Sequence, residues 1–150
     1  MPKSEIREII PAPSEAVFDL LHDYQRRLEW DTLLQEAFLE PEFDKAEKGA
    51  ISVCRGRTFL GGFALRTKYV SFESGKVAAV KMLNNPPFFD KFAVSIRHVD
   101  IDNNNSEIIY GVNFTAKPTF LQPILHPIMS KILNWETKKR LWALKKYFAN

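Results

Sequence analysis

Apolar and polar residues alternate over short stretches of the chain, and a period of two residues predicts β-strands. The first alternating stretch is Glu5–Ile10. After it, Ser14 precedes apolar residues at helical spacing, which predicts a helix with Ser14 as its N-cap. A second short helical stretch covers 26–28, and alternation resumes in a strand that we predict over 32–42.

Turn sequences divide the middle of the chain into further strands, and turns this short make neighbouring strands antiparallel. The turns are Leu60–Gly62, Ser74–Lys76, Asn84–Pro87 and Asp102–Ser106. The stretches predicted as strands around them are 50–59, 62–73, 77–83, 88–101 and 107–116. We therefore expect about six antiparallel strands after the two short helices, in addition to the first strand.

The pattern changes to helical periodicity near Phe120, which predicts one long C-terminal helix with Pro123 and Pro127 near its start. Its apolar stripe consists of Leu121, Leu125, Ile128, Met129, Ile132 and Leu133. An antiparallel sheet with one open face needs a cover, and this helix can supply it. The order of elements therefore predicts an α+β fold with one domain over 1–150.

Composition excludes several classes of protein. The chain has 150 residues, of which 45% are hydrophobic and 13% aromatic, enough for a large core or an apolar pocket. Its first ten residues are charged where a signal peptide needs an apolar run, so we expect a cytoplasmic protein. The single Cys54 excludes an internal disulfide and a Cys-rich metal site. The net charge of +3 is weak evidence for an anionic partner.

Motifs for covalent catalysis and for cofactors are not found in the sequence. Cys54 has no nearby His, and there is no glycine-rich elbow for a nucleophilic serine. The three His residues lack metal-ligand spacing, and the segment FLGGF at 59–63 is not a phosphate loop. We therefore expect neither a metal nor a cofactor.

Three segments carry a resemblance to a known superfamily: Ile9–Asp31, Asn84–Phe92 and Arg140–Phe148. They resemble the START-like (SRPBCC) superfamily, in its polyketide cyclase/dehydrase-like or coenzyme Q-binding-like branch. The first segment is similar to the superfamily's entry into a helix, followed by a turn whose Trp leads into the second strand. By this resemblance Trp30 fills the corner between the short helices and the sheet, while Glu29 and Asp31 stay in solvent.

The resemblance implies the helix-grip fold, a curved antiparallel sheet of about seven strands packed around the long C-terminal helix. In that fold a cavity lies between the sheet and the helix, and members hold lipids, sterols, quinones, polyketides or hormones there. The superfamily shares no catalytic residue. Some members only bind or carry a ligand, and a minority are enzymes, so the fold alone does not choose a function.

Alternation identifies the residues that we expect to face such a cavity. On the strands they are Tyr69, Val80, Met82, Val94, Ile96, His98, Tyr110, Val112 and Phe114. On the helix they are Ile128, Ile132 and Glu136. This largely apolar set, with two phenols, one imidazole and one carboxyl, suits a mostly hydrophobic ligand with one or two polar groups.

Two of these residues have both a chemical and a structural interpretation. His98 is the candidate general base, because a neutral imidazole can accept a proton near neutral pH; alternatively it is a core histidine satisfied by a neighbour. Glu136 is either a polar anchor or acid in the cavity wall, or one half of a surface ion pair with Arg140.

These observations favour binding or transport of a small hydrophobic ligand such as a lipid, quinone or polyketide, without catalysis. The alternatives are an aromatic polyketide cyclase or dehydratase, and a protein-interaction module. A cyclase should bury several polar groups around one point, a carrier should have one polar end, and an interaction module should have a filled cavity and an exposed apolar patch.

The segment KKRLWALKKYF at 138–148 bears on the choice of partner. A basic, aromatic helix leaves open a transient membrane contact, and the alternative is a solvated face with cations near the helix C-terminus. We expect no nucleic-acid partner, because no recognisable motif accompanies these basic residues. The oligomeric state is left open.

Overall fold

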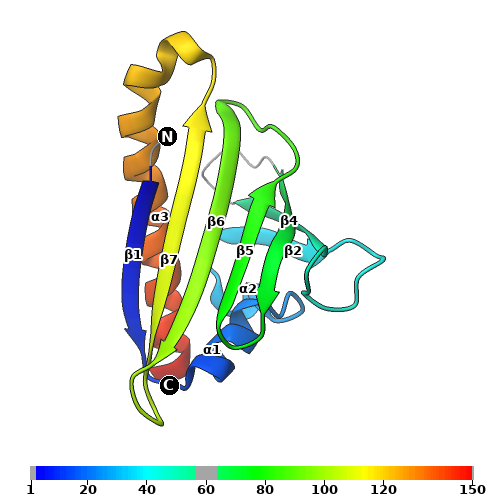
Figure 1. The fold of residues 1–150 in the computed structure, drawn as a ribbon, viewed down its shortest axis with the longest axis vertical. Helices are drawn as coiled ribbons and strands as arrows, with labels where there is room; N and C mark the ends of the chain where they lie inside the picture. Colours follow the sequence, from blue (N-terminus) through cyan, green and yellow to red (C-terminus); the bar gives the residue numbers. More distant parts are fainter. Residues whose placement is uncertain (1–2, 57–63, 150) are drawn as a thin grey trace.

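Seven antiparallel strands form one sheet in the spatial order β1-β7-β6-β5-β4-β3-β2 (Figure 1). This computed structural model describes residues 3–56 and 64–149, so the predicted turn at Leu60–Gly62 lies outside the described residues. The strands are β1 (Lys3–Ile10), β2 (Leu34–Leu39), β3 (Ile51–Gly56), β4 (Ala64–Glu73), β5 (Val77–Met82), β6 (Phe89–Asp100) and β7 (Ser106–Ala116). The helical segments are α1 (Ser14–Leu21), α2 (Arg27–Trp30), the 3₁₀ turn η2 (Thr119–Leu121) and α3 (Gln122–Ala149).

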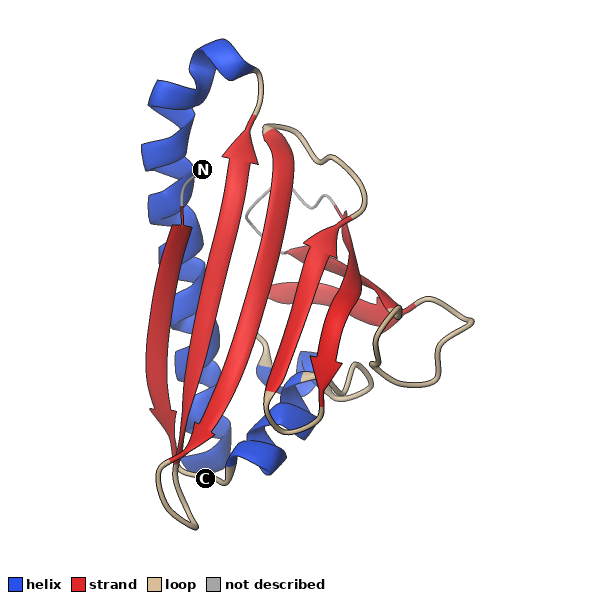
Figure 2. Cartoon of the chain, in the orientation of Figure 1, coloured by secondary structure: helices blue, strands red, loops and turns tan. Residues whose placement is uncertain are grey.

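The sheet is strongly curved, and α3 lies along it behind β1 and β7 (Figures 1 and 2). Strands β2 and β3 turn back behind β5 and β6. The sheet therefore curves partly around the space between its concave face and α3. Helix α3 contacts β1 and β7, whereas α1 contacts β6 and β7. This arrangement confirms the predicted α+β helix-grip fold.

Cross-strand pairs show that the predicted inner faces of β5, β6 and β7 lie side by side. Val94 pairs with Val112, and Ile96 pairs with Tyr110. On the other side of β6, Val94 pairs with Val80 of β5. Because strand side chains alternate between faces, these residues share the concave face and pack toward α3. Alternation in the sequence predicted this face correctly.

Helix α3 packs on the sheet through a stripe that shares Met129 and Leu133 with the predicted one. Its buried residues are Met129, Leu133, Thr137, Leu141 and Leu144, at intervals of four or three positions. Ile128, which we expected on the stripe, is 52% exposed. Neighbouring helical residues are about 100° apart, so the position before Met129 turns away from the sheet.

The entry into α1 differs from the prediction in one detail. Ser14 is the first helical residue, and the cap position is Pro13, which makes no side-chain capping bond. Instead, Asp100 at the end of β6 accepts a hydrogen bond from the Ser14 N–H at 2.9 Å. A carboxylate at this helix end also suits the helix dipole. A tertiary contact therefore replaces the expected local cap.

Trp30 is buried as expected, but the acidic residue after it is not in solvent. The Trp30 side chain packs in the main core with residues of α1, β6, β7 and α3. Glu29 is exposed, whereas Asp31 is only 1% exposed. The expectation of a solvated Asp31 is wrong because Arg27 and Arg140 both pair with its carboxylate inside the protein.

Candidate functional site

A cavity of about 140 Å³ lies between the concave face of the sheet and α3. Its apolar lining residues are Leu33, Leu34, Leu65, Val80, Phe89, Phe92, Val94, Val112 and Leu133. The other lining residues are Arg27, Cys54, Gly56, Thr67, Tyr110, Glu136, Thr137 and Arg140. A mostly apolar chamber with a few polar groups is typical of a site for a small hydrophobic molecule.

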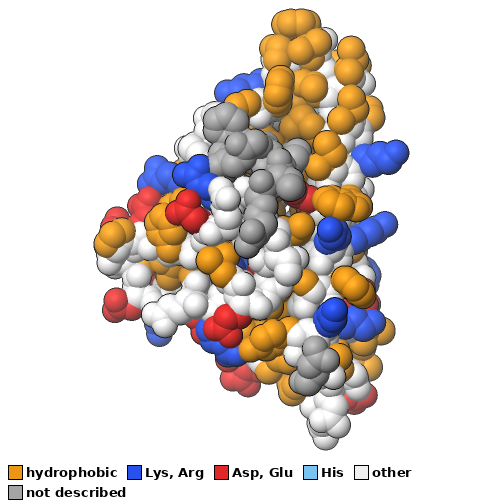
Figure 3. Space-filling model, turned by 180° about the vertical axis from the view of Figure 1, so that it is seen from behind, with side chains coloured by type: hydrophobic (Ala, Val, Ile, Leu, Met, Phe, Trp, Pro, Cys, Tyr) orange, Lys and Arg blue, Asp and Glu red, His pale blue; other side chains and the backbone are white. Residues whose placement is uncertain are grey.

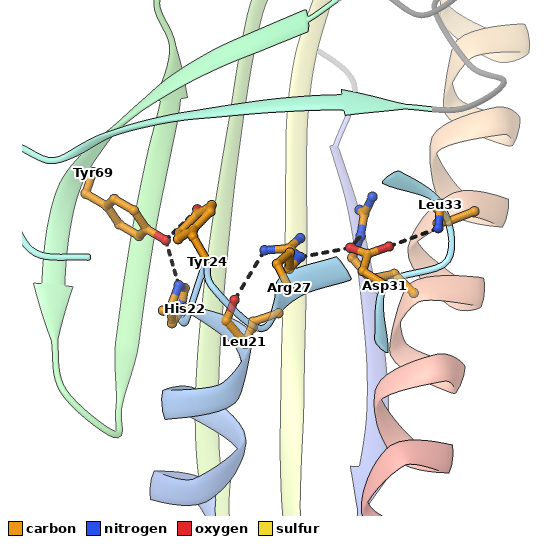
Figure 4. Close-up of polar contacts among 8 residues, drawn as sticks. Leu21, His22, Tyr24, Arg27, Asp31, Leu33 and Tyr69 are labelled. Carbon is orange, nitrogen blue, oxygen red and sulfur yellow. Dashed lines mark hydrogen bonds and ion pairs between the residues drawn. The ribbon is translucent and has the colours of Figure 1, made fainter. Parts of the chain in front are cut away.

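Three charged side chains meet at the wall of this cavity. Asp31 Oδ2 accepts one hydrogen bond from Arg27 Nε of α2 and one from Arg140 Nε of α3, each at 2.9 Å. Asp31 Oδ1 accepts the N–H of Leu33 at 3.1 Å (Figure 4). Arg27 Nη1 also donates to the Leu21 carbonyl at 3.2 Å. One carboxylate therefore joins α2 to α3.

The electrostatics of this cluster keeps all three groups ionised. Burial alone would raise the pKa of Asp31, but Arg140 and Arg27 outweigh it and hold that pKa below its usual value. Burial would likewise lower the pKa of both arginines, but Asp31 counters it and their pKa values are raised. Two guanidinium groups share one carboxylate, so the cluster carries one excess positive charge.

Both arginines present donors to the cavity. Within 3–56 and 64–149, the terminal amino groups of Arg140 and the Nη2 of Arg27 have no hydrogen-bond partner, although both side chains line the cavity. Unpaired donors in a cavity wall are satisfied by water or by the acceptor oxygen of a bound molecule.

Glu136 lines the same cavity, one helical turn before Arg140. Burial raises the pKa of the Glu136 carboxyl, Arg140 opposes this shift, and Asp31 adds to it. The alternative of a surface ion pair between Glu136 and Arg140 is not seen among the described residues, because Arg140 donates to Asp31 instead. The position of Glu136 fits the interpretation as part of the cavity wall.

The structure brings five of the predicted site residues into the cavity wall: Val80, Val94, Tyr110, Val112 and Glu136. Ile96 and Phe114 are buried in the adjoining core, and Met82 packs against that core. Their contact with a ligand stays a prediction.

Two predicted helix residues do not line the cavity. Ile132 is partly buried and Ile128 is exposed. Both lie to one side of the stripe through Met129 and Leu133, so the expectation that they face the cavity is wrong. The residues of α3 in the cavity wall are Leu133, Glu136, Thr137 and Arg140.

His98 is also absent from the cavity wall, which removes the geometric basis for its candidate role as a general base. Its ring centroid lies 5.3 Å from that of Phe18, and within the described residues neither ring nitrogen has a hydrogen-bond partner. Burial lowers the pKa of His98 to about 4. His98 is therefore a neutral core histidine near pH 7, but without the satisfying neighbour that we expected.

Tyr69 lies outside the cavity wall as well, in a buried polar network (Figure 4). Its hydroxyl bonds His22 Nδ1 at 2.7 Å and the Tyr24 hydroxyl at 2.9 Å. Burial lowers the pKa of His22 and raises the pKa of Tyr69. His22 and Tyr24 line a second, wider hollow of about 1030 Å³ beside α1. The expectation that Tyr69 faces the cavity under α3 is therefore wrong.

Sequence reasoning missed the three charged residues that distinguish this site. Arg27 begins the short helix α2 and Asp31 directly follows it, four positions later, which is a usable local signal for an ion pair. Arg140 is 109 positions from Asp31, and no local pattern links them. We paired Arg140 with Glu136 because those two residues lie one helical turn apart.

Residues 3–56 and 64–149 contain no group of three or more His, Cys, Asp or Glu side chains placed to hold a metal ion. None of their helices combines the length and the apolar character needed to span a bilayer.

The fold is similar to that of several solved structures. The ZhuI aromatase/cyclase from Streptomyces sp. R1128 superposes with a TM-score of 0.83 at 10% identity, over 99% of this chain and 93% of that chain. A START superfamily protein from Mycobacterium smegmatis gives 0.80 at 10% identity, over 98% and 97%. The di-domain ARO/CYC BexL from the BE-7585A biosynthetic pathway gives 0.80 at 9% identity, over 97% of this chain and 46% of that chain. Identities this low show a shared fold alone.

Sequence comparison gives one informative match. The family model described as "Polyketide cyclase / dehydrase and lipid transport" matches residues 1–149. Comparison with curated proteins returns no significant relative.

Proposed function

This chain belongs to the polyketide cyclase/dehydrase and lipid transport family, and from that membership we propose that it binds one small, mostly hydrophobic molecule with an anionic or carbonyl end. The apolar part of the ligand occupies the cavity between the sheet and α3. The polar end accepts hydrogen bonds from the unpaired N–H groups of Arg27 and Arg140. A fatty acid, a quinone or a polyketide fragment has this combination of parts.

The observation that carries this proposal is the shared carboxylate. Within the described residues, Asp31 is the only ion-pair partner of Arg27 and Arg140, which both line the cavity. An uncompensated charge away from water is unfavourable. Glu136 also lies in the wall, and burial raises the pKa of its carboxyl, but among the described residues it forms no ion pair with either arginine. A ligand carboxylate or enolate neutralises the cluster and forms charge-assisted hydrogen bonds with it.

The size of the cavity limits what it holds. Engineered apolar cavities of about 150 Å³ bind benzene. A cavity of about 140 Å³ therefore accommodates a single ring or a short acyl segment. An aromatic ring with a short carboxylate tail is a suitable probe, because it fills the apolar part and reaches the arginines.

A second candidate function is cyclisation or dehydration of a polyketide-like chain, and Glu136 is the observation that favours it. Aldol closure needs a group that moves a proton beside a carbonyl and a cation that stabilises the enolate oxygen. Arg27 and Arg140 provide the positive charge. Glu136, whose pKa is raised by burial, is placed in the same wall to exchange the proton. This grouping of polar residues around one point is what we expected of a cyclase.

The binding proposal is tested by calorimetric titration with a series of ligands that differ only at the polar end. We expect 3-phenylpropanoate to bind at least about tenfold more tightly than 3-phenylpropanol, because hydrogen bonds to charged groups are stronger than neutral ones. Arg140→Gln should remove this preference. Arg140→Lys, which keeps the charge but loses the planar fork, should retain part of it.

The matched control is Arg97→Gln, at an exposed position on β6. It should bind the two ligands as the wild type does. Equal affinities of the wild-type protein for the acid and the alcohol would rule out a cationic polar end. The same conclusion follows if Arg140→Gln keeps the preference in full, provided that circular dichroism shows each variant to be folded.

The enzymatic alternative needs its own measurement, a screen of poly-β-keto model substrates with product masses as the readout. Turnover that is lost in Glu136→Gln but kept in His98→Gln would favour the cyclase over the carrier. Absence of any product with the wild type, together with tight binding of the acid probe, would favour the carrier.

A further inference from the structure

The side of α3 that faces away from the sheet exposes large apolar side chains. Phe120 in η2 and Ile124, Ile128, Trp135 and Trp142 in α3 are between 52% and 79% exposed. At about 100° per residue, the four helical residues lie within about a third of the helix circumference. In Figure 3, where α3 runs along the right-hand edge, hydrophobic atoms gather over its upper part. Single exposed apolar residues are ordinary, but a row of them along one helix is not.

Lysines share this surface. Lys131, Lys138, Lys139, Lys145 and Lys146 are all exposed and fall in the same part of the helix circumference. Figure 3 shows Lys and Arg atoms over the lower part of α3. We call these five lysines and the five apolar residues above the outer face of α3.

The outer face of α3 carries no acidic residue. Glu136 is the single acid in α3, and it lines the cavity on the other side of the helix. Lys145 pairs with Glu8 of β1 at 3.2 Å. Within 3–56 and 64–149, the other four lysines of the outer face form no ion pair. Their charge is therefore available to an external anionic partner.

The tryptophans and lysines of this face lie against one another. Lys139 Nζ is 4.5 Å from the centroid of the Trp135 ring, and Lys146 Nζ is 5.5 Å from that of Trp142. Both are cation–π distances. Each pair presents an indole with a cationic group beside it. Tryptophan and lysine side chains of this kind are the usual anchors at a membrane–water interface.

The chemistry of the outer face of α3 favours an anionic bilayer over a second copy of the chain and over a nucleic acid. A second copy of the chain would place the face against itself in a two-fold dimer, so that lysines would meet lysines. A nucleic acid would match the lysines but would leave Phe120 and Ile124 without an apolar partner. An anionic bilayer offers phosphates to the lysines and acyl chains to the apolar residues.

We propose that the outer face of α3 docks on the surface of a lipid bilayer that contains anionic headgroups. The helix lies in the plane of the interface, with its aromatic and aliphatic side chains at the boundary of headgroups and acyl chains. The lysines contact the headgroups, where each one strengthens binding about fivefold. This docking does not depend on which ligand the cavity holds.

The test is co-sedimentation of the full chain with vesicles of phosphatidylcholine alone or mixed with phosphatidylglycerol. Binding is expected with the mixed vesicles only, and it should weaken as salt is added because surface charges are screened. Tryptophan emission should shift to shorter wavelength on binding, because Trp135 and Trp142 leave water. Lys131→Gln/Lys138→Gln should weaken binding by roughly 25-fold. Trp135→Ser/Trp142→Ser should abolish the emission shift.

Two matched control variants remove exposed lysines or exposed apolar residues from parts of the surface away from α3. Lys68→Gln/Lys81→Gln removes two exposed lysines that face each other on β4 and β5. Val99→Ser/Ile101→Ser removes two exposed apolar residues at the β6–β7 end. Both control variants should bind the mixed vesicles as the wild type does.

Three outcomes would overturn the proposal. One is no binding to the mixed vesicles, and another is binding that the α3 variants leave unchanged while the controls weaken it. The third is a dimer in solution that Trp135→Ser/Trp142→Ser dissociates, with no vesicle binding, which would assign this face to self-association.

Discussion

Asp31 is the residue on which the polar end of the cavity depends. It is buried, it accepts two guanidinium N–H groups at 2.9 Å, and its other oxygen accepts a backbone N–H. A buried carboxylate that is fully hydrogen-bonded is tolerated, whereas a buried guanidinium without its counter-ion is not. Asp31 therefore has a structural role, and it also sets the charge that Arg27 and Arg140 present to a ligand.

Asp31→Asn should lower the free energy of unfolding by about 3–5 kcal/mol, because it leaves the buried guanidinium of Arg27 and the partly buried guanidinium of Arg140 without an anion. Urea unfolding at neutral pH measures this loss. Glu73→Gln, which breaks an exposed pair with Lys76, should cost less than about 1 kcal/mol. Equal effects of the two substitutions would show that the Asp31 cluster is not buried as described.

The same carboxylate predicts a dependence of stability on acid. The pKa of Asp31 is lower in the folded protein than in the unfolded chain. Its contribution is therefore fully present above about pH 4 and is lost as pH falls further, through the folded pKa. Asp31→Asn should be less stable than the wild type at neutral pH but should lose less stability below pH 4. If the free energies of unfolding of the wild type and of Asp31→Asn fell in parallel below pH 4, this pH dependence would not come from Asp31.

His98 gives the stability of the protein a second dependence on pH, at higher pH than that of Asp31. Burial lowers its folded pKa to about 4, against about 6.5 in an unfolded chain. Between these values the unfolded state binds more protons, so stability is full above about pH 6.5 and falls toward pH 4. The loss is roughly 3 kcal/mol, and His22 adds to it because its pKa is lowered in the same direction.

His98→Leu should remove the His98 share of that loss and leave the His22 share. The substitution breaks no side-chain hydrogen bond among the described residues, because neither ring nitrogen of His98 has a partner there. Urea unfolding at about pH 7 and about pH 4.5 compares the variant with the wild type. A variant that loses as much stability as the wild type between these pH values would place the titration elsewhere.

At the scale of elements, α3 has two faces with different tasks. One packs on β1 and β7 and contributes Leu133, Glu136, Thr137 and Arg140 to the cavity. The other carries the exposed tryptophans and lysines. The boundary between them passes through Ile132, which is partly buried. Substitutions on the outer face are therefore expected to leave the cavity intact.

Val80 offers a direct way to fill the cavity from the sheet side. Val80→Phe should reduce the affinity for 3-phenylpropanoate at least tenfold, while the free energy of unfolding stays level or rises by up to about 2 kcal/mol. Titration calorimetry and urea unfolding measure the two quantities. Val70→Phe, at an exposed position of β4, is the control and should change neither. Undiminished affinity in Val80→Phe would place the ligand outside this cavity.

Helices and strands are predictable from the sequence where the pattern that indicates them lies within a few neighbouring residues. Alternation identified the shared face of Val94 and Val112 because strand periodicity is visible within a few residues. The Ser14 cap was misassigned because its partner, Asp100, lies 86 positions away. Ile128 was misplaced because an apolar residue at the edge of a helical stripe can turn either way, and packing on β1 and β7 decides which.

At the scale of the whole molecule, the fold brings distant residues to one point. Strand β1 and helix α3 are at opposite ends of the sequence and lie side by side (Figure 1). The same closure carries Arg140 to Asp31. The order of elements and the family resemblance were enough to predict the cavity. Its polar end was not predictable, because it forms only when α2 and α3 meet.

The most direct measurement of the central claim is an NMR titration with 3-phenylpropanoate that follows the arginine Nε–H resonances and the methyl groups. We expect the Arg27 and Arg140 Nε–H signals to shift together with the methyl signals of Val80, Val94 and Val112, at one ligand per chain. Shifts confined to the hollow beside His22 and Tyr24, or no shift at Arg27 and Arg140, would contradict a ligand site with its polar end at this arginine pair.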